Sequence, residues 1–409
     1  MSATGSRAEQ RVAIVGGSIV GLLAGNLFHR MGWEVEIFER TAGVMEGRGA
    51  GITILPGLVE AFEAAGVHEE VYGIELPERI ALDRSGRIVA QRKFAQVMTS
   101  WRRLYDFLRA AFPAERYRGG VSVDRVDQTE AGATVHLAGG ERAHADLVIA
   151  ADGLRSTIRN QLLPDVKPFY PGYIAWRCLV DETALSASTH DLLFGRYTVC
   201  VSPGQQGIGY PVPGPDHSMQ PGKRQYNVVW YQAIDEAHLP ELMTDDNGRH
   251  HVHGIPPALI RTQVRKQMIE DAHDTLAPQF AEAIERARLT FFQPIVDLEL
   301  PRLVFGRIVI VGDAAFTARP HVAMGIPKGG ADVLELASRL RRAGEDHPSA
   351  LASFESTRLR VGRAIVARGR YLGTYMEAQL KSQAERREAE QQRVPERVMM
   401  ETAAPTRYE

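Results

Sequence analysis

Short apolar runs alternate with helix-like segments in the first and the last third of the chain. Residues 12–15, 147–151 and 307–311 form such runs, and each stops at a glycine or an aspartate. A helical pattern follows each run after a short turn. β-Branched runs between breakers predict buried strands, and their alternation with helices favours an α/β sheet. We therefore expect segments far apart in the sequence to share one sheet.

The middle of the chain has a strand-like alternation of apolar and polar residues, with turns rich in Gly and Pro. The alternating segments are residues 173–180, 197–202, 207–212 and 226–233. This pattern predicts an antiparallel sheet. A short piece near residues 78–94 is expected to join that sheet, and residues 257–288 read as amphipathic helix.

The end of the sequence has a long helical pattern over residues 349–385, and its composition from about residue 391 is typical of a loose tail. The expected domains are therefore discontinuous. The first domain takes residues 1–77, 95–170 and 290–348, the inserted sheet domain takes 78–94 and 171–289, a helical segment takes 349–390, and a flexible tail takes 391–409.

Composition agrees with a globular protein of two or three domains. Lys+Arg 48 against Asp+Glu 50 give a net charge of −2, which argues against a generic nucleic-acid or anionic-membrane surface. The two cysteines, Cys178 and Cys200, suggest neither a disulfide framework nor a thiolate metal site, and a reducing cytoplasm is the expected location. The polar first ten residues do not resemble a signal peptide, and no apolar run approaches the ~18 residues that span a membrane.

A glycine-rich turn follows the first predicted strand. Residues 16–21 read Gly-Gly-Ser-Ile-Val-Gly, a helix and a second strand come next, and Glu39 stands at the end of that strand. This is the βαβ fingerprint of a dinucleotide site, in which the acidic residue binds a ribose hydroxyl. Ser18 replaces the central glycine of that fingerprint. The alternative is a plain βαβ unit, and the place of the motif between strand and helix favours the nucleotide.

Two other predicted strands end in aspartates. Asp152 follows the second run, and by itself it could be only a turn residue or a helix cap. Asp313 follows the third run and could accept hydrogen bonds from hydroxyls, while Gly312 lets a ligand approach the backbone closely. The helix-like segment from Pro327 could face an electron-rich ligand with its N-terminal N–H groups.

The GGSIVG turn with Glu39, the segment ADGLRSTIR and the segment GDAA together resemble the FAD-dependent aromatic hydroxylases, the single-component flavoprotein monooxygenases. The resemblance covers roughly residues 10–375. It implies an α/β fold, with a Rossmann-like FAD-binding domain, an inserted, mainly antiparallel β-sheet substrate domain and a long C-terminal helix. It also implies FAD as cofactor, O₂ and a small aromatic ring as substrates, and NADH or NADPH as a transient reductant that binds without a second fingerprint.

The resemblance further implies which residues contact FAD. It places the fingerprint and Glu39 at the ADP half, Asp152 near the pyrophosphate and the path of the reductant, and Asp313 at the ribityl chain. The expected cofactor-binding residues are Gly16, Ser18, Ile19, Gly21, Glu39, Arg40, Arg48, Gly51, Arg103, Asp152, Asp313, Pro320, Gly325 and Ile326. Arg48 could equally be a solvated surface arginine. Trp101 occupies a position where many relatives have an FAD-contacting arginine, and Arg102 or Arg103 could substitute for it.

One departure points to a branch of the family. After Pro320, the common pattern of glycine, glutamine, glycine and asparagine is replaced, and only Gly325 is kept. The run ARPHVAMGIPKGGAD, GYIAWRCLV at 172–180 and YNVVWYQ at 226–232 look most like the 2,6-dihydroxypyridine hydroxylase branch.

The chemistry implied by the resemblance passes oxygen from a flavin C4a-hydroperoxide to an activated ring. It needs charge stabilisation near the flavin, for which the helix start at residues 325–328 is the candidate, and an apolar pocket that excludes water. It also needs help in deprotonating a substrate hydroxyl. His321 is the candidate base, because the ordinary histidine pKa of about 6.5 suits proton transfer near neutrality. His321 could instead only hydrogen-bond its loop, and Tyr210 could touch substrate or be a satisfied core tyrosine.

Other polar and aromatic residues have simpler interpretations. Trp176 and Trp230 could wall the pocket, but filling of the sheet core is favoured. His250, His251 and His253 lie between turn residues, so a solvated loop is favoured over a metal site, and no metal ligand set is apparent.

Three functions are left open by the sequence. The first is NAD(P)H-dependent hydroxylation of a small electron-rich ring, a hydroxylated pyridine or a related N-heterocycle. The second is hydroxylation of a phenolic acid of the salicylate type, with Arg177 or Arg319 as a clamp for the carboxylate. The third is a flavoprotein that oxidises without oxygenating, or a flavin scaffold. Apolar residues on the long C-terminal helix could also pair with a second subunit, so a homodimer is one expectation.

Overall fold

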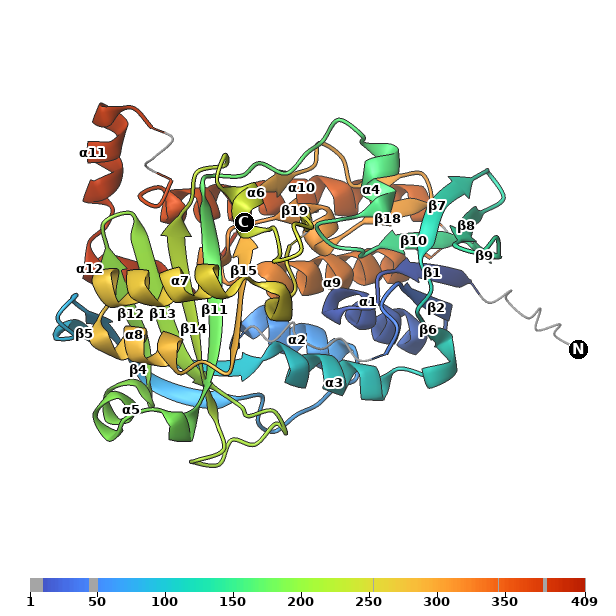
Figure 1. The fold of residues 1–409 in the computed structure, drawn as a ribbon. Coiled ribbons are helices and arrows are strands. Elements are labelled where there is room, and N and C mark those ends of the chain that lie inside the picture. The colour runs from blue at the N-terminus through green and yellow to red at the C-terminus, as the bar shows by residue number, and fades with distance from the viewer. Residues whose placement is uncertain (1–9, 44–50, 253, 345, 378–380, 409) are drawn as a thin grey trace, which may run out of the picture.

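The computed structural model describes residues 10–43, 51–252, 254–344, 346–377 and 381–408, which form two large sheets and the helices that cover them (Figure 1). The first sheet has the strand order β17-β18-β10-β1-β2-β6. Its strands are β1 (Arg11–Val15), β2 (Glu34–Glu39), β6 (Tyr117–Gly119), β10 (Leu147–Ala150), β17 (Val304–Phe305) and β18 (Ile308–Ile310). The ladders from β18 to β6 are parallel. The three predicted apolar runs are thus neighbouring parallel strands, β1, β10 and β18.

The second sheet is antiparallel except for the parallel pairing of β12 with β4, and it has the order β15-β11-β14-β13-β12-β4-β5-β3. Its strands are β3 (Gly51–Ile54), β4 (Ile74–Leu82), β5 (Ile88–Ser100), β11 (Tyr173–Asp181), β12 (Arg196–Ser202), β13 (Gln205–Val212), β14 (Gln225–Ala233) and β15 (Leu289–Pro294). The predicted α/β fold with an inserted, mainly antiparallel sheet is confirmed.

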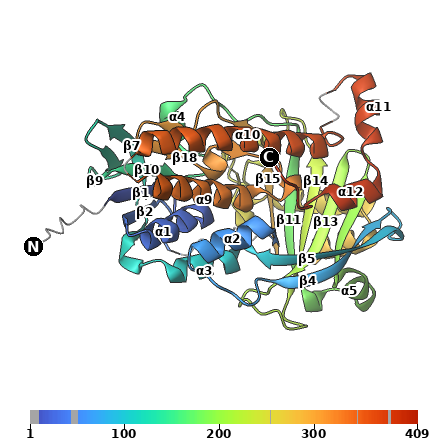
Figure 2. The same cartoon turned by 180° about the vertical axis from the view of Figure 1, so that it is seen from behind.

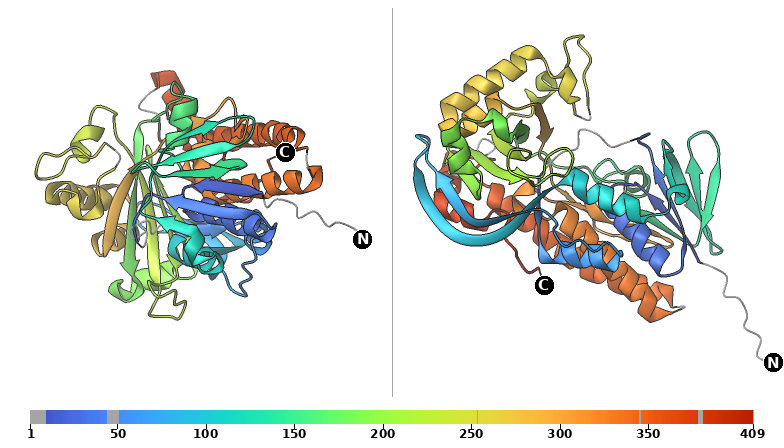
Figure 3. Two further views of the ribbon diagram at one scale, coloured as in Figure 1. Left: turned by 90° about the vertical axis from the view of Figure 1, so that its right-hand side faces the viewer. Right: turned by 90° about the horizontal axis from the view of Figure 1, so that it is seen from below.

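The predicted boundaries of the inserted sheet are wrong in two places. The sheet takes all of β4 and β5 and also β3, not only residues 78–94, and it takes β15, which was expected in the first domain. β4 and β5 form a long curved ribbon at the edge of the sheet (Figure 3). Much of β5 is exposed on both faces, so its sequence lacks the alternation that marks a half-buried strand.

Helices pack on both sheets. The helices near the first sheet are α1 (Ile19–Arg30), α2 (Pro56–Ala64), α3 (Trp101–Ala111), α4 (Thr157–Leu162), α9 (Gly325–Ala343) and α10 (His347–Gly373). Figure 2 shows α9 and α10 running side by side from the first sheet toward the second. The outer face of the second sheet carries α7 (Thr262–Thr275) and α8 (Pro278–Glu285), which together confirm the amphipathic helical segment predicted there.

Shorter elements complete the chain. They are β7 (Val123–Gln128), β8 (Ala133–Leu137), β9 (Arg142–Ala145), β16 (Leu298–Glu299), β19 (Phe316–Thr317), α5 (Ala187–Leu193), α6 (Leu239–Leu242), α11 (Gln383–Gln391) and α12 (Pro395–Glu401). The long C-terminal helix ends at Gly373, earlier than the predicted residue 385.

The expected flexible tail is wrong. α12 packs on the inner face of the second sheet, where Met399 is fully buried and Val398 is 6% exposed. The guanidinium of Arg79 on β4, itself buried, donates to the carbonyl oxygens of Met399, Thr402 and Ala403 at 2.6–3.0 Å. A buried guanidinium needs acceptors and the sheet needs an apolar cover, and this segment supplies both.

Glycines let α10 approach the loop that leads into α9. A Cβ at Gly369 would lie 3.1 Å from the backbone nitrogen of Arg319, and one at Gly373 would lie 2.6 Å from the Tyr173 hydroxyl. A side chain at either position would therefore have to push its neighbour aside. This close approach fixes the loop between the two sheets.

Candidate active site

The carboxyl ends of β1, β10 and β18 bring the three sequence motifs together. The register pairs Val15 with Ala150 and Ala150 with Ile310, so Gly16, Asp152 and Asp313 all follow at the same edge of the sheet. Gly16 has φ +99°, and a Cβ there would lie 2.5 Å from the Ala151 carbonyl oxygen. The three motifs therefore lie at one edge of the sheet, as predicted. Ligands of open α/β sheets bind at this edge, beyond the carboxyl ends of the strands.

The fingerprint turn is held around Glu39. Its carboxylate accepts from the backbone N–H of Gly17 at 2.9 Å and from that of Thr41 at 2.8 Å, and the residue is 5% exposed. Ser18 is the N-cap of α1, but its side chain makes no capping hydrogen bond, so its hydroxyl is available to a ligand. Ile19 is buried in the core and Arg40 is exposed.

One oxygen of the Asp152 carboxylate lacks a hydrogen-bond partner among the described residues. Its Oδ2 accepts from the Ile158 N–H at 3.3 Å, while its buried Oδ1 has no hydrogen-bond partner among the described residues. Burial raises the pKa of Asp152. Ser156 caps α4, and Arg159 donates to the Leu154 carbonyl at 2.7 Å, so these two residues of the motif are structural.

Asp313 follows β18 and faces a buried lysine that sequence reasoning missed. The Lys328 side chain on α9 is fully buried, and its ammonium lies 3.5 Å from Asp313 Oδ1, a carboxylate that is 48% exposed. No described residue accepts a hydrogen bond from the Lys328 Nζ. The signal was an isolated lysine within the small and apolar residues Met324–Ala331.

Gly51, in the segment predicted to approach the flavin, contacts residues of the second sheet. Its N–H donates to Asn227 Oδ1 at 3.3 Å, and a Cβ there would lie 2.3 Å from Tyr210 Cε2. Tyr210 is therefore packed against the chain segment predicted to border the flavin. Arg48 lies outside the described residues.

Arg103 lies in the first turn of α3 and is held by loop carbonyls. Its guanidinium donates to the Val71 oxygen at 2.9 Å and to the His217 oxygen at 3.3 Å. Arg102 pairs with Asp106 instead. The structure thus shows Arg103 as the arginine that ties α3 to the neighbouring loops, and its predicted FAD contact stays a prediction.

The loop from β18 to α9 carries His321. A 3₁₀ turn covers Pro320–Val322, Ala323 has a left-handed φ of 53°, and α9 begins at Gly325 with Ile326 in its first turn. The capping residue Met324 offers no side-chain acceptor, so the first N–H groups of α9 lack a side-chain cap. Such a helix start favours an electron-rich group.

The inner face of the second sheet is lined with tyrosines. Tyr173 on β11, Tyr210 on β13 and Tyr231 on β14 lie in the apolar cluster of this face. Burial raises the pKa of each phenol, that of Tyr231 to about 12, so all three stay protonated at neutral pH. Trp176 and Trp230 point to the opposite face, toward α7 and α8, and fill the core there, as the sequence interpretation favoured.

His321 contacts this tyrosine face. Its Nε2 lies 2.9 Å from the Tyr173 hydroxyl, and its ring centroid is 4.3 Å from that of Tyr231. It is 1% exposed, and its Nδ1 has no hydrogen-bond partner in the described part of the chain. Burial, together with the charges of Arg319 and Arg177, lowers the pKa of His321 to about 3. The ordinary histidine pKa that supported a base role therefore does not apply, and the imidazole is neutral.

Two other features concern metals and membranes. The described residues include no group of three or more His, Cys, Asp or Glu side chains placed to hold a metal ion. His251 pairs with Asp245 at 2.7 Å, and His250 is exposed. Across the described ranges, no helix is both long enough and apolar enough to cross a membrane.

Comparisons with known proteins show which families the chain is similar to. A family model described as "FAD binding domain-like" matches residues 170–297. The chain is 29% identical over 368 residues to a 2,6-dihydroxypyridine 3-monooxygenase of Paenarthrobacter nicotinovorans, which covers 88% of this chain and 89% of the relative. It is 26% identical over 407 residues to a 3-hydroxybenzoate 6-hydroxylase of Polaromonas naphthalenivorans, with 95% and 94% covered.

A solved structure shares the fold. The 2,6-dihydroxypyridine-3-hydroxylase from Arthrobacter nicotinovorans superposes with a TM-score of 0.85 at 27% identity, over 91% of this chain and 94% of that one.

The residues present fit FAD. The turn at Gly16 leaves no room for a side chain, and two buried polar atoms, Asp152 Oδ1 and Lys328 Nζ, have no hydrogen-bond partner among the described residues. These atoms lie after the three adjacent strand ends, where the dinucleotide is expected. The resemblance indicated by the motifs is thus confirmed: over nearly its whole length, the chain has the sequence pattern and the fold of the FAD-dependent aromatic hydroxylases.

Proposed function

We propose that this protein uses FAD, NADH or NADPH, and O₂ to hydroxylate a small electron-rich ring, a hydroxylated pyridine or a related N-heterocycle. The observation that carries the proposal is the loop from Asp313 to Gly325. It begins at a motif for the flavin, ends at the start of α9, and holds His321 against the tyrosine face of the second sheet. The likeness to the 2,6-dihydroxypyridine 3-monooxygenase supports a pyridine ring.

The cofactor would be held by the three strand ends. In this proposal Glu39 and Asp313 accept hydrogen bonds from ribose and ribityl hydroxyls, and Asp152 and Lys328 bind polar groups of the same ligand. The lack of hydrogen-bond partners at Asp152 Oδ1 and Lys328 Nζ among the described residues supports it. Arg40, Arg103, Gly51, Pro320, Gly325 and Ile326 belong to the same proposed set. A bound FAD would supply the redox chemistry, namely acceptance of a hydride from NADH or NADPH and activation of O₂ for transfer to the ring.

The protein's own part is to bind, orient and enclose the ring. The phenols of Tyr173, Tyr210 and Tyr231 stay neutral and provide an aromatic wall, which keeps water from the reacting atoms. His321 remains neutral and holds a substrate oxygen by hydrogen bonding, so the substrate hydroxyl must reach the site already ionised or lose its proton through another group.

A second function has one observation in its favour. Hydroxylation of a phenolic acid requires a cation for the carboxylate, and Arg177 on the inner sheet face has no ion-pair partner among the described residues. Arg319 is committed to Asp297 and Glu377 and cannot serve.

The test is stoichiometry with a panel of hydroxypyridines and hydroxybenzoates. The expected result is consumption of one NAD(P)H and one O₂ for each hydroxylated ring, with little H₂O₂, for a hydroxypyridine. Rapid NAD(P)H oxidation that yields only H₂O₂ with every ring would favour an oxidising flavoprotein instead.

The proposed homodimer would use the flank of α10 that its own chain leaves partly open. Leu351, Phe354, Ile365 and Val366 of the predicted apolar stripe are buried within the chain, whereas Leu359, Tyr371 and Leu372 are only partly buried. Light scattering at micromolar concentration tests the oligomer, and a single monomeric mass would end that part of the proposal.

A further inference from the structure

Arg177 is a buried cation without a counter-ion. It lies on β11 opposite Val229 of β14 and Phe291 of β15, and it is 9% exposed. Within the described part of the chain, it makes no ion pair and its side chain donates no hydrogen bond, and its Nε is buried without a partner. A buried guanidinium carries a large desolvation cost when nothing compensates its charge.

The neighbours of Arg177 are neutral and belong to the tyrosine face. Arg177 pairs with Val229 on β14, so it lies diagonally beside Tyr231, two residues along that strand. The His321 ring centroid is 4.3 Å from that of Tyr231, and Tyr210 lies on the neighbouring strand β13 in the same apolar cluster as Tyr231. Arg177, His321 and both tyrosines are buried, and the phenols keep their protons. The cluster therefore carries one uncompensated positive charge in an aromatic setting, which is the surrounding that a flat anionic ring would match.

The other arginine near the site behaves differently. Arg319 is fully buried, but its guanidinium lies 2.9 Å from Asp297 Oδ2 and 3.0 Å from Glu377 Oε2. Arg370 shares Asp297 at 3.1 Å. Because its charge is already balanced, Arg319 can position its loop but offers no free cation to a ligand.

His321 adds a second donor beside Arg177. Among the described residues, Nε2 of His321 is the one hydrogen-bond partner of the Tyr173 hydroxyl. We assign the phenol as donor and Nε2 as acceptor, with the hydrogen of the neutral ring on Nδ1, because the reverse tautomer would leave both the phenol hydrogen and the Nδ1 lone pair unpaired. That Nδ1–H is buried and has no partner in the described ranges.

We infer that the ring substrate binds as an anion, with its charged oxygen on the Arg177 guanidinium and the His321 Nδ1–H. The inference rests on the proposed function and names the charge of its substrate. The shared chemistry is an anionic oxygen on a small aromatic ring, either a ring oxyanion, as in an ionised hydroxypyridine, or a carboxylate. Arg177 then selects against neutral rings of the same shape.

The experiment measures dissociation constants with the FAD-loaded enzyme, from the change that a bound ring makes in the flavin absorbance. Two ligand pairs separate charge from shape: 2,6-dihydroxypyridine with 2,6-dimethoxypyridine, and 3-hydroxybenzoate with 3-hydroxybenzamide. The variants are Arg177→Gln and Arg177→Lys, with Arg84→Gln in an exposed turn as control. FAD content and far-UV circular dichroism verify that each variant is folded.

We expect Arg177→Gln to weaken binding of the preferred anion at least tenfold, to change binding of its neutral partner less than twofold, and to leave FAD content intact. Arg177→Lys should recover part of the lost affinity. The control Arg84→Gln should leave the affinity for both ligands unchanged. If the dissociation constant falls as pH rises above the pKa of the ligand's own hydroxyl, the bound anion is the ring oxyanion. A pH-independent preference for the benzoate identifies the carboxylate.

Equal affinity of the wild type for charged and neutral partners would overturn the inference, and so would an Arg177→Gln variant that keeps the wild-type preference. If Arg177→Gln fails to fold, Arg177→Lys and the wild-type ligand pairs decide alone. Preferred hydroxylation of neutral rings would overturn the inference and leave the proposed function standing. Tight anion binding without hydroxylation of any ring would support the inference and remove the proposed function.

Discussion

At the scale of single residues, the proposed site contains four polar atoms that are buried without a hydrogen-bond partner among the described residues. They are Asp152 Oδ1, Lys328 Nζ, Arg177 Nε and His321 Nδ1. Buried polar groups are normally satisfied, so each of these atoms is a candidate for contact with a ligand. The sequence motifs identified Asp152 and His321. They could not show that the Lys328 Nζ is buried 3.5 Å from Asp313 without a hydrogen bond to any described residue, because this arrangement depends on packing between α9 and the end of β18.

Replacement of His321 by alanine should slow hydroxylation by roughly 10²–10³-fold, because the substrate oxygen loses a positioned hydrogen-bond donor. Rapid-mixing measurement of ring hydroxylation checks the rate, and FAD content should stay near wild type. A variant with normal rate and little H₂O₂ would confine His321 to loop structure and make Tyr210 the next candidate.

The depressed pKa of His321 predicts a pH dependence of stability. The ordinary histidine pKa is about 6.5 in the unfolded chain and about 3 in the fold, so the unfolded state binds more protons below pH 6.5. This stability is fully present above pH 6.5 and is lost as pH falls toward 3. Between pH 7 and pH 5, the wild type should lose about 2 kcal/mol more unfolding free energy than His321→Gln. Urea titrations of both proteins at the two pH values measure the difference, and parallel losses would contradict the low pKa.

Removal of the buried ammonium by Lys328→Met should weaken FAD binding by about 1–3 kcal/mol, because a charge-assisted contact with the cofactor is lost. Asp313→Ala should have an effect of the same size. Lys266→Met, at an exposed position on α7, is the control. Titration of the apoprotein with FAD measures the affinity, and unchanged affinity in both site variants would remove α9 and the end of β18 from the cofactor site.

At the scale of elements, the predictable parts were those whose pattern is local. β1, α1, β2, β10 and β18 follow from apolar runs and a glycine turn, and the core strands β11 to β14 follow from alternation. β5 and α12 did not follow. β5 is largely exposed, and α12 owes its place to acceptors for Arg79, a residue more than 300 positions away in the chain. Packing across such distances leaves no periodic signal in a single sequence.

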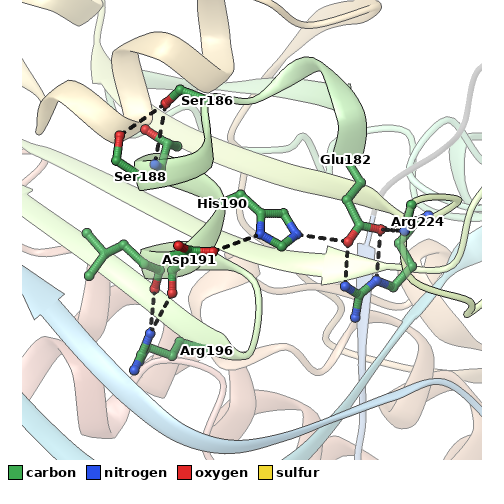
Figure 4. Close-up of polar contacts among 10 residues, drawn as sticks. Glu182, Ser186, Ser188, His190, Asp191, Arg196 and Arg224 are labelled. Atoms are coloured by element: carbon green, nitrogen blue, oxygen red, sulfur yellow. Dashed lines mark hydrogen bonds and ion pairs between the residues drawn. The ribbon is translucent and has the colours of Figure 1, made fainter.

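A carboxylate also holds together the end of β11 and the start of β14. Figure 4 shows Glu182 between His190 and Arg224; it lies 2.9 Å from His190 Nε2 and accepts from the Gly222 N–H at 2.8 Å. Burial would raise the pKa of Glu182, but the hydrogen bonds from Arg224 and His190 outweigh it and lower the pKa to about 2.

Glu182→Gln should lower the free energy of unfolding by about 3 kcal/mol near neutral pH, because Arg224 and His190 lose their shared anion. The contribution is present above the ordinary glutamate pKa and is lost as pH falls toward 2, so the difference between variant and wild type should shrink below pH 4. Denaturant unfolding at pH 7 and pH 3 measures both values. A difference that grows toward pH 3 would contradict the assignment.

At the scale of the whole molecule, the second sheet and the cofactor sheet are joined by segments that cross between them. α10 lies along α9 and reaches the Arg319 loop, and the segment after α12 donates the Ala403 N–H to the His321 carbonyl at 2.8 Å. The carbonyl oxygen of Ala403 in the same segment accepts a hydrogen bond from the Arg79 guanidinium on β4. Residues from the far end of the sequence thus fix the loop that carries the proposed substrate contact.

Met399→Ala should therefore destabilise the protein by about 2–4 kcal/mol and also weaken binding of the ring, because the cavity left under α12 loosens the segment that holds His321. Met400→Ala, at a partly buried neighbouring position, should have a smaller effect on both. Thermal unfolding and ligand titration measure the two quantities. Loss of stability with unchanged ring affinity would separate α12 from the site.

The bond between Ala403 and His321 has a consequence for biosynthesis. Domains usually fold as units while the ribosome is still adding later residues. Here β1 must wait for β10, β10 must wait for β18 and β4 must wait for β12, and the histidine loop gains its last backbone contact only when Ala403 has left the exit tunnel. Nascent chains should therefore expose unpaired strands through much of translation, and the ability to bind a ring should arise only once Ala403 has left the exit tunnel.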